Sequence, residues 1–116
     1  MAKDVSTVMD ENTFNAIAEA ELQAIAQAID DSGVDCDAEF KASGVLEVGF
    51  GDGTRMVINR HSAAREIWVA ARTGGFHFRR VGDRWLDSRD GRELRRALSE
   101  LITVCSGEPV QLPGAA

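Results

Sequence analysis

The chain has 116 residues, of which 44% are hydrophobic and 28% are charged, and its net charge is −6. This length and composition predict one globular domain with a single core, and the acidic balance argues against a nucleic-acid partner, because phosphates require a clustered basic surface. No apolar run reaches the roughly 18 residues that span a bilayer, and the N-terminus lacks the pattern of a signal peptide, so we expect a cytoplasmic protein without a membrane segment.

The N-terminal third predicts a helix followed by a strand. Residues 1–9 have no clear period and are expected to form a loose leader. From Asn12 to Ile29 the apolar residues recur three and four positions apart, which predicts an amphipathic helix of four to five turns that starts at Asp10 or Asn12 and stops at Ser32-Gly33. The period then changes to two, as in a half-buried strand with an inner row and an outer acidic row: Cys36, Ala38 and Phe40 alternate with Asp35, Asp37 and Glu39.

The rest of the chain predicts strands and a closing helix. The strands are expected at 45–50, 54–60, 66–72, 76–80 and 84–87, with turns at Gly51-Asp52-Gly53 and Thr73-Gly74-Gly75. Apolar residues between Leu94 and Cys105 predict a second helix that ends at Ser106-Gly107, and residues 111–116 are expected to form a loose tail. This order indicates an α+β domain over residues 1–116, a two-layer sandwich with both terminal helices on one face of an antiparallel sheet of about six strands.

Alternation along the strands predicts which side chains face away from the helices. The outward set is Arg55, Val57, Asn59, Glu66, Trp68, His77 and Arg79. An indole on a polar sheet face is typical of a contact surface. The alternative is that Trp68 packs with Val57 and arginine stems in a small outer cluster.

The sequence offers little for covalent catalysis. No Gly-x-Ser-x-Gly elbow is present, neither cysteine has a histidine nearby in sequence, and the distance between Cys36 and Cys105 predicts two core residues rather than a metal or disulfide motif. A metal site formed by His61 and His77 has no support from their spacing.

The acidic residues are the more informative group. Residues 1–40 contain ten acidic residues and one basic residue, which gives about −9, whereas residues 41–116 carry about +3. Carboxylates from the end of the first helix and from the following strand would suit hard cations such as Mg²⁺, Ca²⁺, Mn²⁺ or iron, or a basic partner. A solvated acidic face that maintains solubility is the competing interpretation.

Several motifs resemble the signature of the frataxin family, most closely its bacterial members. They are Ile58-Asn59-Arg60, Glu66-Ile67-Trp68-Val69-Ala70 and Gly74-Gly75-Phe76-His77-Phe78, and the similarity extends over nearly the whole chain. The chain departs from the family pattern in places: His61 and Glu66 replace glutamines, Ser62 stands where the family has proline, and Ser32-Gly33-Val34 shortens the acidic stretch after Asp31.

The resemblance implies a sandwich with two near-parallel helices and a non-enzymatic, iron-binding adaptor or regulator of iron–sulfur cluster assembly. It implies weak binding of Fe²⁺ and Fe³⁺, a cysteine desulfurase and an iron–sulfur scaffold protein as partners, and a monomer in the absence of iron. The implied metal residues are Glu11, Glu19, Asp30, Asp31, Asp35 and Asp37. The implied partner-binding residues are Asn59 and Trp68, with Asp30, Asp31, Arg60 and His77. Two alternatives stay open, namely a ferroxidase that oxidises or stores iron at the carboxylates and an acidic interaction domain without metal.

Overall fold

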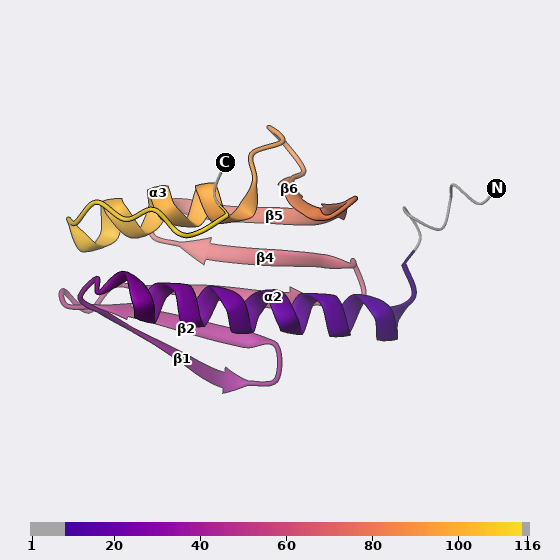
Figure 1. Ribbon diagram of the computed structural model, residues 1–116, viewed down its shortest axis with the longest axis horizontal. Helices are drawn as coiled ribbons and strands as arrows, with labels where there is room; N and C mark the ends of the chain where they lie inside the picture. Colours follow the sequence, from indigo (N-terminus) through magenta and orange to yellow (C-terminus); the bar gives the residue numbers. More distant parts are fainter. Residues whose placement is uncertain (1–8, 115–116) are drawn as a thin grey trace.

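The computed structural model describes residues 9–114, which form two helices and a six-stranded sheet (Figure 1). The elements in chain order are α2 (Glu11–Ser32), β1 (Cys36–Ala42), β2 (Val45–Phe50), β3 (Arg55–His61), β4 (Glu66–Ala71), β5 (Gly74–Val81), β6 (Arg84–Asp87) and α3 (Leu94–Ser106). The predicted α+β class and the number of strands are therefore confirmed. Neither helix is long and apolar enough to cross a membrane.

Local signals at both ends define α2. The Asp10 carboxylate accepts a hydrogen bond from the Thr13 amide at 2.7 Å, and the hydrogen bonds from Thr13 lower the pKa of Asp10. At the other end Gly33 adopts φ 76°, and its amide donates to the Asp30 carbonyl. The helix has 22 residues, about six turns rather than the predicted four to five, because it continues without a break between these caps.

The strands form an antiparallel meander in sequence order, from β1 at one edge to β6 at the other. Side chains alternate between the two faces, and the inner row contains the fully buried Met56, Ile58, Ile67 and Phe78, as the alternation predicted. One predicted turn was wrong. Arg72 and Thr73 make the turn, while Gly74 and Gly75 already pair with Ala71 and Ala70 in the β4–β5 ladder.

Both helices lie on the same face of the sheet and run in nearly the same direction (Figure 1). The core lies between these two layers, where Phe14 of α2 meets Trp85 of β6 edge to face with ring centroids 5.9 Å apart. Arg95 of α3 donates two hydrogen bonds to Glu21 of α2, from Nε at 2.9 Å and from Nη2 at 3.1 Å, so an ion pair joins the helices.

The first and last described residues are more tightly held than the sequence indicated. Residues 1–8 of the predicted leader and residues 115–116 of the predicted tail lie outside the described residues, but the Met9 carbonyl accepts a hydrogen bond from Arg65. The expectation of a loose tail was wrong for residues 111–113. They run back along α3 (Figure 1), Leu112 is 1% exposed, and its amide donates to Ser99 at 2.9 Å.

Candidate functional site: an acidic end and a stacked sheet face

Four carboxylates gather where α2 ends and β1 begins. Asp30, Asp31, Asp35 and Asp37, here called the acidic end, are all exposed, because the helix cap at Gly33 turns the chain directly into the edge strand. Within residues 9–114 none of them forms an ion pair, and the one side-chain contact is a hydrogen bond from Gln27 to Asp31 at 3.0 Å. Their charges are therefore available to a cation or to a basic partner.

Shallow grooves flank β1 at the acidic end. One, of about 270 Å³, lies between α2 and β1, and its lining includes Asp30, Asp37 and Gln27. The other, of about 330 Å³, lies on the far side of β1, and its lining includes Asp35 and Asp37. Cys36 borders both grooves. Cys36 and Cys105 were predicted in the core; both pack against it but are only half-buried. Burial, followed by the charges of Asp37, Asp35 and Glu108, raises the pKa of the Cys36 thiol.

The neighbouring acids of the sheet are paired with bases. Glu39 and Glu47 lie directly opposite each other across β1 and β2, and the Lys41 ammonium lies 3.3 Å from one and 3.5 Å from the other. The hydrogen bond to Glu39 is the largest of the contributions that raise the pKa of Lys41. Arg55 adds an ion pair to Glu47 at 2.8 Å. These contacts neutralise the acids that continue β1 and β2 beyond the acidic end.

The other two predicted metal residues do not join this group. Glu11 lies in the first turn of α2, and at 1.5 Å of rise per residue its backbone is about 28 Å along the helix from that of Asp30. Glu19 lies between them and pairs with Arg60 of β3, with Oε1 and Nη1 3.5 Å apart. The structure therefore divides the six predicted metal residues into four that gather and two that do not.

The acidic end does not form a closed metal shell. Among residues 9–114 no group of three or more histidine, cysteine, aspartate or glutamate side chains is placed to hold one metal ion. Exposed carboxylates suit hard cations such as iron by ligand type, but without convergence they bind weakly and keep most of the metal's water ligands.

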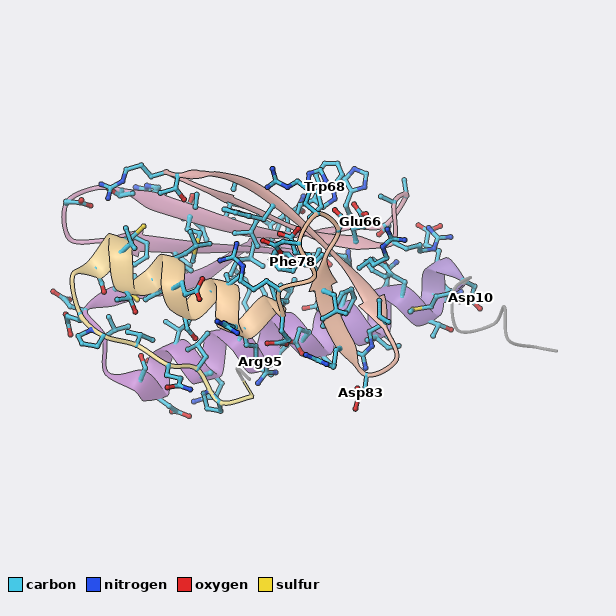
Figure 2. All side chains as sticks on the ribbon, turned by 90° about the horizontal axis from the view of Figure 1, so that it is seen from above. Asp10, Glu66, Trp68, Phe78, Asp83 and Arg95 are labelled. Atoms are coloured by element: carbon cyan, nitrogen blue, oxygen red, sulfur yellow. The ribbon has the colours of Figure 1, made fainter. Side chains whose placement is uncertain are left out.

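Trp68 lies on the face of the sheet opposite the helices (Figure 2), and its ring stacks between two histidines. Its ring lies 3.8 Å from the His61 ring and 4.4 Å from the His77 ring, centroid to centroid, and each pair is within 14° of parallel. The indole Nε1 donates to Oε1 of Glu66 at 2.7 Å. Trp68 is therefore half-buried by imidazoles, and since it separates them, His61 and His77 do not form a paired metal site.

The remaining predicted partner-binding residues lie on two different faces. Asn59 is directly opposite Trp68 in the β3–β4 ladder, and His77 is opposite Trp68 in the β4–β5 ladder, so all three share the outer face. Arg60 projects to the helix side toward Glu19. The sequence did not predict the stacking of His61 on Trp68. The signal was present, because His61 comes two residues after Asn59 on the same strand and therefore lies on the same outer face.

Comparison with known proteins assigns a family to this architecture. Residues 7–108 match the model of the frataxin-like domain. Over 104 residues the chain is 48% identical to the iron-sulfur cluster assembly protein CyaY of Dechloromonas aromatica, covering 90% of this chain and 99% of that protein. The CyaY protein of Paraburkholderia phymatum is 44% identical over 105 residues, which cover 90% and 98%. Frataxin from Psychromonas ingrahamii superimposes with a TM-score of 0.83 at 30% identity, covering 89% of this chain and 97% of that structure.

Proposed function

Because this chain belongs to the frataxin family, we propose that it is an iron-binding adaptor or regulator of iron–sulfur cluster assembly that works in the cytoplasm. Its partners would be a cysteine desulfurase and an iron–sulfur scaffold protein, and it would bind them as a monomer when no iron is present. The observation that carries the proposal is the acidic end, with four exposed carboxylates that have no basic partner among residues 9–114.

The acidic end would dock on a basic patch of the desulfurase. Unpaired surface charges steer association and set the register of an interface more than they add affinity. Trp68 and Asn59 would add a second contact on the outer face of the sheet. Strand spacing and rise place Trp68 about 20 Å from Asp37 across the sheet, a separation that one partner of standard interface size can cover.

Iron would bind at the same carboxylates, as cargo and not as a resident cofactor. Asp30, Asp31, Asp35 and Asp37 are the candidate ligands, used one or two at a time. An ion held there would neutralise part of the charge that docks the desulfurase, so iron and the partner would compete or share ligands. Glu11 and Glu19 contribute less to this proposal, because one lies at the far end of α2 and the other pairs with Arg60.

A charge-matched comparison tests the docking role. The variant Asp30→Asn with Asp31→Asn raises the net charge from −6 to −4, and so does the single substitution Asp83→Lys. Asp83 lies in the β5–β6 turn (Figure 2), away from the acidic end. We expect the first variant to weaken desulfurase binding and to reduce its salt dependence, and Asp83→Lys to leave both near wild type. If the two variants weakened binding equally, the net charge of the protein would explain the effect, and the acidic end would have no specific role in docking.

A titration with Fe²⁺ tests the iron role. Paramagnetic broadening is expected for Asp30, Asp31, Asp35 and Asp37, with little effect on Glu11. Oxidation of Fe²⁺ beyond one equivalent with turnover, abolished by Asp31→Asn, would instead favour a ferroxidase. If Fe²⁺ broadened no resonance of the acidic end, the protein would be an acidic docking domain without metal.

A further inference from the structure

The stack on the outer sheet face changes what Trp68 can offer a partner. His61 covers one face of the indole and His77 covers the other, at 3.8 Å and 4.4 Å. Both π-faces are therefore already occupied, and the indole ring presents its edge to a partner. Large aromatic anchors bind best when their orientation is set before binding, since ordering them on association costs free energy.

The two histidines differ in how they would accept a proton. The His61 Nδ1 atom accepts a hydrogen bond from the Ala64 amide at 3.3 Å, so a proton added at that nitrogen would break the bond. The His77 Nδ1 atom lies 3.9 Å from Oε1 of Glu66, the same oxygen that accepts from the Trp68 indole. A charged imidazole at position 77 would thus attract the Glu66 carboxylate beside it and the indole face against it, which is the geometry of a clamp.

Other charged and titratable groups lie around His77 on its own strand and on the neighbouring strands. On β5, Arg79 is directly opposite Glu66 and opposes the charge on His77, but it forms no ion pair with Glu66 in the described structure. On β3 the neighbours are Asn59, which is neutral, and His61. At the end of β6, Asp87 is 5% exposed and its carboxylate accepts hydrogen bonds from the Arg89 and Asp90 amides, while the Arg89 guanidinium donates to the Gly75 carbonyl.

We propose that His61 and His77 are positioning residues that clamp the Trp68 indole between them, and that protonation of His77 tightens this clamp and strengthens docking through the sheet face. The clamp concerns the free protein, and its effect on docking rests on the function proposed above. Histidine is the side chain that ordinarily changes charge near neutral pH.

The free protein provides the first test. It has two tryptophans, so two indole N–H resonances can be followed from pH 8 to 5.5, and the buried Trp85 serves as the internal control. The Trp68 resonance is expected to titrate together with the His77 ring in wild type. His77→Phe keeps an aromatic ring but removes the proton site, so it should abolish the titration, and the matched variant His61→Phe should retain it. A Trp68 titration that persists in His77→Phe, or that is absent in wild type, overturns the clamp.

Desulfurase binding provides the second test. The affinity ratio of wild type to His77→Phe, measured at pH 8 and pH 6, cancels any titration of the desulfurase itself. We expect this ratio to rise by between about twofold and fivefold at the lower pH. A ratio that stays constant overturns the link to docking. If Trp68→Ala leaves the affinity unchanged at both pH values, the sheet face is removed from the proposed function, while the indole titration still decides whether the clamp exists.

Discussion

Nη1 of Arg60 on β3 lies 3.5 Å from Oε1 of Glu19 on α2. Glu19 was expected to bind metal and Arg60 to bind a partner protein, but in the structure the two side chains contact each other. Gln23 donates to the second carboxylate oxygen of Glu19 at 3.3 Å. Gly44 makes room for the guanidinium, because a Cβ at that position would stand 2.7 Å from the Arg60 Nε atom. The pair connects the helix layer to the sheet, which favours a structural role.

Replacing Glu19 with glutamine should therefore affect stability more than docking. The pair is partly exposed, with 35% of the Glu19 side chain accessible, so we expect a loss of about 0.5 to 1 kcal/mol in the free energy of unfolding. Desulfurase affinity and its salt dependence should stay unchanged. Urea unfolding and a binding isotherm measure the two quantities, and Glu11→Gln is the control with the same change of charge. If Glu19→Gln lost much affinity for the desulfurase and Glu11→Gln did not, Glu19 would belong to the docking surface.

The faces of the sheet could be predicted from the sequence, whereas the contacts on them could not. Alternation with period two placed Trp68, Asn59 and His77 on the outer face, because successive side chains of a strand point to opposite sides. The stack with His61 depends on the register between β3 and β4, which the turn at residues 62–65 sets. Arg60 was grouped with its neighbour Asn59 in sequence, although adjacent residues of one strand lie on opposite faces.

Contacts between distant parts of the chain were also beyond sequence reasoning. Glu21 and Arg95 are 74 positions apart, and their pairing follows from the packing of two helices on one sheet. The tail was expected to be loose, but the burial of Leu112 and the hydrogen bonds of the Leu112 amide and the Pro113 carbonyl hold this part of it against α3. The acidic end was accessible from the sequence, because a helix stop and a strand start are both local signals.

The Arg95–Glu21 pair predicts a measurable contribution to stability. Only 20% of the Arg95 side chain and 14% of the Glu21 side chain are exposed, and the pair is bidentate. Arg95→Met should lower the free energy of unfolding by about 1 to 3 kcal/mol, because it leaves the Glu21 carboxylate without its donors. Arg96→Met is the matched control, since Arg96 is 59% exposed and forms a surface pair with Glu100. Equal effects in a urea titration would contradict a special role for the buried pair.

Leu112 should hold the C-terminal segment against α3. Its side chain is 1% exposed, and the Leu112 and Val110 amides donate to Ser99 and Thr103. Leu112→Ala is expected to cost about 2 to 5 kcal/mol, the usual range for a truncated core leucine. It should also speed hydrogen exchange of the Leu112 amide, while the exposed neighbour Gln111 can be replaced by alanine with little effect on either. Unchanged exchange in Leu112→Ala would show that the hydrogen bond to Ser99 alone holds the segment.

The reactivity of Cys36 should report the electrostatic potential of the acidic end without any partner. Burial raises the pKa of this thiol, and the charges of Asp37, Asp35 and Glu108 raise it further, so the reactive thiolate is scarce near neutral pH. Asp37→Asn removes one of these charges and lowers the pKa toward its usual value. The thiolate fraction below that pKa then increases, and we expect alkylation of Cys36 by iodoacetamide to become roughly twofold faster. Mass spectrometry can follow Cys36 and Cys105 separately, and the rate at Cys105 should not change.

The same measurement can detect a cation at the acidic end. Mn²⁺ bound to Asp35 or Asp37 would place positive charge near Cys36, stabilise the thiolate and accelerate its alkylation more than NaCl of equal ionic strength. In Asp35→Asn with Asp37→Asn this extra acceleration should disappear, because the ligands are gone, although the basal rate is higher. Equal acceleration by MnCl₂ and NaCl in the wild-type protein would mean that the carboxylates attract ions only as a diffuse atmosphere. In that case the proposed iron site would lose its support, and docking would be the remaining role of the acidic end.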